Sequence, residues 1–199
     1  MLFKGNEMLT WKRDMMVILM LLCMPVLAQA GEIRTDIIYP KNATAVAAGK
    51  GNVALWVEDT RENKVFGRAV DGEYIVPGSD LAASLYAYMV TSLKAAGYQV
   101  VPYGSELANG MLVRIRSIAY TASREMIKSK VEVKVVLDAK MNSSSTTRTY
   151  QAAVEDQFVL SPSVADNGSM IGNGLATAAA SILADIAVSP QPGAEDSGQ

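Results

Sequence analysis

The sequence contains no histidine and only one cysteine, Cys23, among its 199 residues. The absence of histidine excludes a Ser–His–Asp triad, a Cys–His pair and any metal site built on imidazole ligands. A single cysteine excludes an internal disulfide and a thiolate zinc site. The commonest catalytic and metal-binding arrangements are therefore not available to this chain.

Charge is also sparse and nearly balanced. Charged residues make up 19% of the chain, and the formal net charge is −2. A surface that binds nucleic acid normally carries a clear excess of positive charge. We therefore expect no nucleic-acid partner, and the sequence offers no motif that predicts a cofactor.

The N-terminus has the three parts of a secretory signal. A basic leader that ends at Arg13 precedes an uninterrupted apolar run. The segment Ala28-Gln29-Ala30 follows, and it is the small-x-small pattern that a signal peptidase accepts. The apolar run is shorter than the roughly 20 residues that a membrane-spanning helix needs. We expect residues 1–30 to be a signal peptide that is cleaved between Ala30 and Gly31.

Cys23 provides an alternative to this cleavage. In a bacterial lipoprotein the lipid is attached to a cysteine directly after the apolar run, and small residues usually precede that cysteine. Here the preceding residues are Met20-Leu21-Leu22, and none of them is small. Lipidation would convert a soluble periplasmic protein into one anchored to the outer membrane, whereas an unmodified Cys23 only fills the apolar run. We expect membrane contact only through the signal or a lipid on Cys23.

Beyond the signal, the composition divides the chain into three parts. Residues 31–51 contain a short strand pattern and then a linker of small and polar residues flanked by Gly and Pro. Residues 52–188 alternate between strand and helix patterns and are expected to form a single α+β domain. Residues 189–199 are rich in Pro, Gly and acidic residues, which is typical of a disordered tail.

One strand and one helix are clear in the first half of the domain. Residues 52–58 (NVALWVE) have the composition of a buried strand. Apolar residues then recur every four positions from Leu81 to Leu93, which predicts a helix. Ser79 is the expected N-cap of this helix, and Gly97 is expected to end it.

The second half predicts a meander of three long strands and a final helix. The clearest strand alternates apolar and charged residues over 131–141, which indicates one buried and one solvated face. The strand before it slips in phase near Ser117, which predicts a β-bulge. A helix is expected to begin near Ser163 or Asp166 and to end at about Val188. The simplest arrangement is an α+β fold with a mostly antiparallel sheet and two helices packed on one face.

A group of carboxylates surrounds the predicted turn after residue 58. Glu58, Asp59 and Glu62 could form a hard-cation or acid–base site there, since both uses need several carboxylates at close quarters. No calcium-loop spacing is present, however, and Arg61 and Lys64 would neutralise the group. The alternative is an ordinary solvated turn.

Asp156 interrupts the inward register of the last predicted strand. An inward carboxylate needs a partner, and Arg114 or Arg116 could reach it across the sheet. A binding site and a structural ion pair at a strand end are both compatible with this pattern.

A stripe of small residues runs along the final helix at intervals of four. Its members are Gly168, Gly172, Ala176, Ala180 and Ala184. Small residues at this spacing let another backbone approach closely. That backbone is either the protein's own sheet or a partner, including a second copy of the chain.

The stretch from Asn52 to Ala187 resembles the YajG-like envelope lipoproteins of Gram-negative bacteria. The matching segments are NVALWVEDTREN, LAASLYAYMVTSLKAAGYQVVP, MLVRIRSIAYTAS, KSKVEVKVVLDAKMN, TRTYQAAVEDQF and IGNGLATAAASILADI. The resemblance implies an exported, envelope-associated α+β domain, and it supplies no catalytic residues. The chain departs from the family at Cys23, which lies in a poor lipidation motif.

Two hypotheses for function follow. The first is a non-enzymatic exported envelope protein, a periplasmic or outer-membrane-associated module that binds or assembles envelope proteins. The second is a small-ligand-binding protein or a hydrolase that uses carboxylates such as Asp59 or Asp156. The second hypothesis requires a concave pocket in which those carboxylates have raised pKa values.

Overall fold

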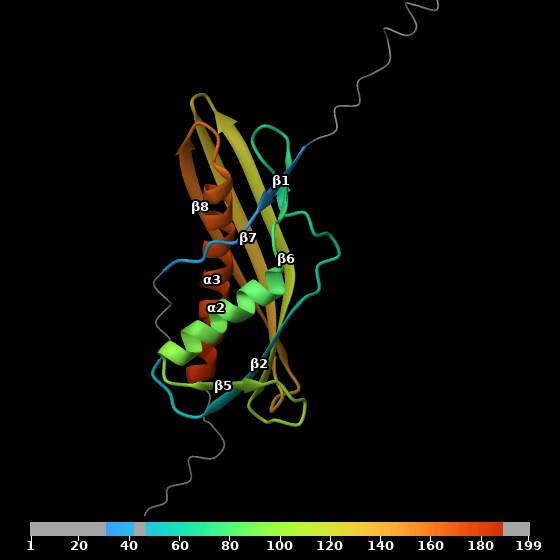
Figure 1. Ribbon diagram of the computed structural model, residues 1–199, viewed down its shortest axis with the longest axis vertical. Helices are drawn as coiled ribbons and strands as arrows, with labels where there is room; N and C mark the ends of the chain where they lie inside the picture. Colours follow the sequence, from blue (N-terminus) through green and yellow to red (C-terminus); the bar gives the residue numbers. More distant parts are fainter. Residues whose placement is uncertain (1–30, 42–46, 189–199) are drawn as a thin grey trace, which may run out of the picture. The chain divides into compact units, whose positions relative to one another are not determined.

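The computed structural model describes residues 31–41 and 47–188. The chain divides into two units, Met1–Ala30 and Gly31–Gln199, and only the second contains described residues. Its elements follow one another along the chain (Figure 1): β1 (Glu32–Thr35), β2 (Asn52–Asp59), β3 (Gly67–Arg68), β4 (Tyr74–Pro77), α2 (Leu81–Ala95), β5 (Gln99–Pro102), β6 (Gly110–Glu125), β7 (Lys128–Met141), β8 (Thr147–Val159) and α3 (Val164–Val188). The expected signal peptide, Cys23 and the expected tail lie outside the described residues.

The described strands form an 8-stranded mixed sheet, so the prediction of a mostly antiparallel sheet is wrong. The pairings β1–β4, β2–β5, β2–β6 and β3–β6 are parallel. The pairings β3–β4, β6–β7 and β7–β8 are antiparallel, and the last two form the expected meander of long strands. The fold is still α+β, but its smaller strands join the meander mainly in parallel.

The parallel pair β2–β5 is joined by a long connection that contains β3, β4 and then α2. A helix between two neighbouring strands returns the chain to the end at which the first strand began, so the second strand runs in the same direction. Asn52 of β2 therefore lies opposite Gln99 of β5. The pattern of apolar residues predicts each strand, but it does not predict whether that strand pairs in parallel or antiparallel with its neighbour.

Both helices cover the face of the sheet that carries the buried side chains (Figure 1). Alternate residues of β6 and β7 supply this face, including the fully buried Ile115 and Leu137. From α2 the buried side chains include Leu85 and Met89, and from α3 they include Leu175. The expected apolar faces of both helices thus meet in one core.

The ends of α2 confirm one prediction and correct another. Gly97 follows the C-cap residue and has φ +96, a backbone conformation that glycine adopts without cost. The N-cap is Asp80, because its carboxylate accepts a hydrogen bond from the backbone N of Ala83 at 3.0 Å. The prediction of Ser79 was wrong by one residue, since both side chains can cap a helix and the sequence does not fix the first turn.

The predicted bulge is present in β6. The register between β6 and β7 shifts between Ile115 and Ser117, so Arg116 has no residue opposite it on β7. The shift restores the inward direction of Ile118 and Tyr120, which are both buried. Tyr120 then donates a hydrogen bond from its hydroxyl to Asn167 of α3, and burial raises its pKa to about 12.

Candidate functional site

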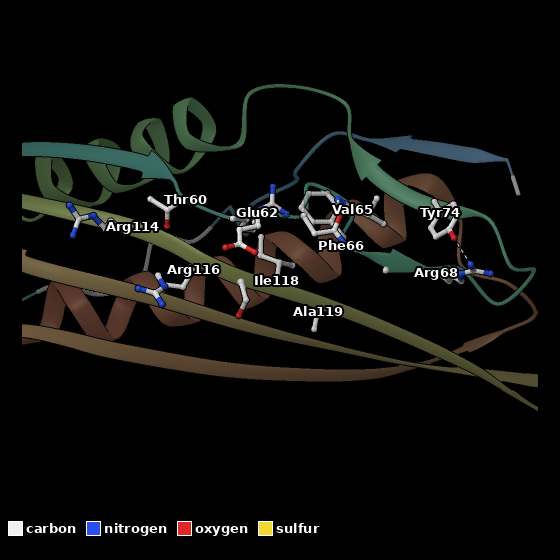
Figure 2. Close-up of a pocket in the computed structure, with 14 residues that line it drawn as sticks. Thr60, Glu62, Val65, Phe66, Arg68, Tyr74, Arg114, Arg116, Ile118 and Ala119 are labelled. Carbon is white, nitrogen blue, oxygen red and sulfur yellow. Dashed lines mark hydrogen bonds between the residues drawn. The ribbon is translucent and has the colours of Figure 1, made fainter.

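The candidate site is an open cleft beside the bulge of β6, with a volume of about 910 Å³ (Figure 2). Its walls are the loop between β2 and β3, the start of β4 and the middle of β6. The charged residues that line it are Arg61, Glu62, Arg68, Arg114 and Arg116. Four guanidinium groups and one carboxylate therefore surround the same cleft.

The cleft exists because β6 changes partners along its edge. β2 pairs with β6 as far as Asp59 and Ile115, and β3 joins β6 only at Gly67 and Tyr120. The loop between them leaves the plane of the sheet after Thr60, whose backbone N and hydroxyl both donate to the carbonyl of Ile115. Within the described residues, no strand pairs with this side of β6 over residues 116–119.

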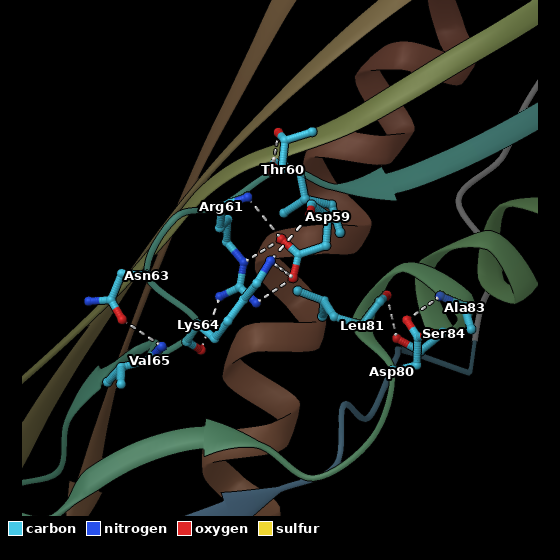
Figure 3. A network of polar contacts seen from close by, with 11 residues as sticks. Asp59, Thr60, Arg61, Asn63, Lys64, Val65, Asp80, Leu81, Ala83 and Ser84 are labelled. Carbon is cyan, nitrogen blue, oxygen red and sulfur yellow. Dashed lines mark hydrogen bonds and ion pairs between the residues drawn. The ribbon is translucent and has the colours of Figure 1, made fainter.

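An ion-pair network shapes the loop behind the cleft (Figure 3). Arg61 binds both carboxylate oxygens of Asp59, with Nε to Oδ1 and Nη2 to Oδ2 each at 2.9 Å. Lys64 lies 3.2 Å from the second oxygen. The guanidinium of Arg61 also stacks 4.9 Å from the ring centre of Phe66. These contacts leave Arg61 only 5% exposed, so it positions the loop rather than offering a free charge.

The same network determines the pKa of Asp59. Burial raises that pKa, but the hydrogen bonds and charge of Arg61, with a further contribution from Lys64, outweigh burial. The net result is a pKa below the ordinary value, so the carboxylate stays ionised. A general acid needs the opposite shift.

Arg114 and Arg116 project from β6 on the face away from the core. Arg114 pairs with Glu58, which lies opposite it in the register of β2 and β6. Arg116, the bulged residue, pairs with Asp138 at 3.2 Å, and Thr149 donates to the other oxygen of Asp138 at 2.7 Å. Each of these two guanidinium groups is partly exposed and held by a carboxylate on a neighbouring strand.

Arg68 closes the far end of the cleft. Its guanidinium lies 4.3 Å from the ring centre of Tyr74 and donates to the hydroxyl of that residue. Glu62 is exposed at the rim. The arrangement suits a ligand that carries carboxylate or phosphate oxygens, because guanidinium groups bind such oxygens through paired hydrogen bonds.

The structure separates the three carboxylates that the sequence placed in one candidate site. Glu58 faces Arg114, Asp59 faces Arg61 and Glu62 is exposed. Within the described residues, no group of three or more acidic, histidine or cysteine side chains could hold a metal ion.

Asp156 is exposed and does not meet the arginines of β6. Its carboxylate accepts a hydrogen bond from the backbone N of the next residue, Gln157, at 2.7 Å. Arg114 and Arg116 have the partners described above. Asp156 keeps the inward register, opposite the buried Val131, but its side chain is exposed, so it needs no partner from β6.

The glycines of the stripe on α3 lie against the chain segment that follows β1. A Cβ at Gly168 would lie 2.2 Å from the carbonyl oxygen of Asp36, and one at Gly172 would lie 2.1 Å from that of Ile38. Ile38 also donates its backbone N–H to the carbonyl of Gly168 at 3.2 Å. Ala176 is buried, whereas Ala180 is half-buried and Ala184 is exposed. At the glycines the close backbone approach is therefore made within the chain, by the segment after β1 and not by the sheet that was expected, and a partner contact at Ala184 stays a prediction.

The signal residues Ala28 and Ala30 and the lipidation candidate Cys23 are outside the described residues. Gly31 is the first described residue, and it is exposed. Neither helix in the described part of the chain is long and apolar enough to cross a membrane.

Sequence reasoning did not identify the cleft. It named Arg61, Arg114 and Arg116 only as partners for carboxylates, and it did not consider Arg68. The one usable signal was the phase slip near Ser117, because bulges occur frequently beside binding sites.

Comparison with protein families identifies the class of protein that has this fold and cleft. The model of the family described as uncharacterized lipoprotein matches residues 40–190. The chain belongs to this family, which confirms the resemblance to YajG-like lipoproteins. The membership makes it an envelope lipoprotein in the broad sense, and it assigns neither the periplasm nor the outer membrane.

Individual proteins resemble this chain only distantly. No curated protein matches the chain. Among solved structures, the rare lipoprotein B from Shewanella oneidensis aligns at 8% identity and a TM-score of 0.36, over 67% of this chain and 87% of its own. A hypothetical protein from Chlamydia trachomatis aligns at 12% identity and a TM-score of 0.39, over 70% of this chain and 96% of its own.

Proposed function

We propose that this protein is a non-enzymatic binding module of the cell envelope whose cleft holds an acidic segment of a partner protein. The observation that carries the proposal is the set of three exposed or partly exposed guanidinium groups, those of Arg68, Arg114 and Arg116, that line the cleft. Electrostatic complementarity of this kind selects partners and speeds their association. The proposed role is binding or assembly, at the periplasmic face of the envelope.

The state of the charged groups supports binding over catalysis. Carboxylate-dependent hydrolysis needs a carboxyl group with a raised pKa, and the pKa of Asp59 is lowered. Asp156, the other carboxylate suggested for such a reaction, is exposed and outside the cleft. The arginines, by contrast, are already oriented by their partners, so a ligand would meet a prepared surface.

The test measures binding of a fluorescein-labelled oligo-glutamate peptide to the exported protein, with an oligo-glutamine peptide as the neutral control. We expect Arg116→Gln and Arg68→Gln each to weaken binding about tenfold, the effect of one charge-assisted hydrogen-bond pair. Glu62→Gln removes the one carboxylate of the cleft lining and should strengthen binding. Raising the salt concentration should weaken all of these complexes.

Arg34→Gln is the matched control, because Arg34 is an exposed arginine on β1 that does not line the cleft. Its binding should equal that of the wild type. Equal affinity for the two peptides, or equal losses from Arg34→Gln and Arg116→Gln, would overturn the proposal.

A further inference from the structure

Large apolar side chains are exposed together at one end of the long meander. Met126 and Ile127 form the turn between β6 and β7 and are 97% and 74% exposed. Val159 and Leu160, at the end of β8, are 75% and 70% exposed. The backbone N of Leu160 donates to the carbonyl of Ile127 at 3.2 Å, so the two pairs lie side by side. We call these four residues the apolar tip.

Two residues of the apolar tip have an unfavourable backbone conformation. Met126 has φ 52 and Leu160 has φ 73, in the left-handed region that glycine and asparagine tolerate better. Met and Leu adopt this conformation less readily than a residue suited to the turn would. The chain thus combines conformational cost with exposed apolar surface at one place, and such combinations occur at contact sites.

The charges around the apolar tip cancel one another. Arg124 pairs with Asp71 at 3.1 Å, and Lys130 pairs with Glu155 at 2.9 Å. Lys128 lies opposite Glu125 in the β6–β7 register. A tip without excess charge meets no electrostatic barrier at a negatively charged surface, and its binding does not depend on charge attraction.

The chain enters the described domain at the same end as the apolar tip (Figure 1). The strand register connects the two places. Glu32 of β1 pairs with Tyr74 of β4, and Tyr74 pairs with Arg68 of β3. Arg68 in turn pairs with Thr121, near the end of β6. The segment from Cys23 to Gly31 spans at most roughly 28 Å when fully extended. In the alternative form with a lipid on Cys23, this end of the domain would be held beside the bilayer, and in the expected form that begins at Gly31 the apolar tip would be the only membrane contact proposed for this end.

We infer that the apolar tip inserts into the interfacial region of a lipid bilayer. A protein partner would also cover apolar side chains, but the position of the chain entry favours lipid as the occupant. The inference is independent of the cleft, which lies farther along β6. In a chain that begins at Gly31, the tip would attach the domain to the membrane without a covalent lipid.

The test places an environment-sensitive fluorophore on Met126→Cys in the full-length exported protein. Cleavage after Ala30 removes Cys23 and lipidation blocks its thiol, so the introduced cysteine is the reactive one in either form. Vesicles of phosphatidylethanolamine and phosphatidylglycerol should shift the emission to the blue and shield the label from an aqueous quencher. The same label on Ser145→Cys, in the turn at the other end of β7, should show neither effect.

Leu160→Asn distinguishes insertion from misfolding, because asparagine tolerates the left-handed backbone and removes the apolar side chain. It should keep the melting temperature and lower the fraction of inserted label about tenfold at limiting lipid. Insertion should persist in high salt and in Arg116→Gln, so failure of the cleft proposal leaves this one intact. An unchanged Met126→Cys spectrum with vesicles, or a blue shift that needs only a higher protein concentration, would overturn the inference.

Discussion

Arg61 shows how one residue can shape a site without offering its charge to a ligand. It is nearly fully buried, bound to both oxygens of Asp59 and stacked on Phe66. The loop that walls the cleft is therefore closed by contacts between residues two to five positions apart. Its neighbours in the cleft remain partly exposed because their carboxylate partners lie on other strands.

Arg61→Gln should destabilise the protein by about 2 kcal/mol at pH 7, because it leaves Asp59 without its main partner. The loss should shrink as the pH falls below 4. The pKa of Asp59 is lowered in the folded state, so its contribution is present above the unfolded value and disappears as the carboxylate is protonated. Urea unfolding at pH 7 and pH 3 measures both values.

The control for this experiment is again Arg34→Gln, which should change the free energy of unfolding little at either pH. Any loss in Arg61→Gln that survives at pH 3 is assigned to its packing on Phe66. A difference from wild type that stays the same from pH 7 to pH 3 would contradict the ion-pair explanation.

At the scale of the residue, features that depend on neighbouring residues were predicted from the sequence, whereas contacts between distant residues were not. The bulge near Ser117 and the role of Gly97 were predicted, since each follows from neighbouring residues. The exposure of Asp156 was not predicted, because its inward register, opposite Val131, does not determine whether another element covers it. Arg68 entered no prediction, since only the pairing of β3 with β6 brings it to the cleft.

At the scale of the element, the helix α2 was predicted correctly, but the strand pairing around it was not. Its existence and apolar face followed from the four-residue spacing, and both are present in the structure. The parallel pairing of β5 with β2 was missed, because β3 and β4 separate β2 from α2 in the sequence and the spacing of apolar residues does not identify the partner of a strand. The meander was predicted correctly, since its strands are long and joined by short turns.

The prediction at this scale concerns the N-cap of α2 and its contribution to stability. Asp80→Ala removes the hydrogen bond to the backbone of Ala83 and should lower the free energy of unfolding by about 1 kcal/mol. Ser79→Ala should change it by less than about 0.5 kcal/mol, since the neighbouring Asp80 caps the helix. Urea unfolding of the two variants measures the difference, and a larger loss for Ser79→Ala would show that the cap lies one residue earlier.

At the scale of the whole molecule, the family assignment and the signal motif predict different first residues for the processed chain. A lipoprotein of this family would begin at a lipidated Cys23, whereas the motif Ala28-Gln29-Ala30 predicts a chain that begins at Gly31. The residues before Cys23 are bulky, and those before Gly31 are small. The second site is therefore the better substrate for cleavage.

We expect intact-mass spectrometry of the exported protein to give a chain that begins at Gly31 without lipid. Ala30→Leu should block this cleavage and leave the precursor mass, because the peptidase accepts small residues there. A mass that corresponds to a diacylated chain beginning at Cys23 would contradict the prediction. Cys23→Ser should leave processing unchanged if Gly31 is the true start.

The contact between Ile38 and Gly168 also bears on when this protein can fold. The segment after β1 is among the first parts of the mature chain to be made, and it packs on a helix near the end of the sequence. β1 itself pairs with β4, and β2 pairs with β6, so this part of the sheet depends on contacts between residues far apart in the sequence. Such contacts form slowly, and a core that lacks its last helix stays incomplete during synthesis. We expect a chain built in this way to fold only after its last helix is made, which would suit the export that the signal motif predicts.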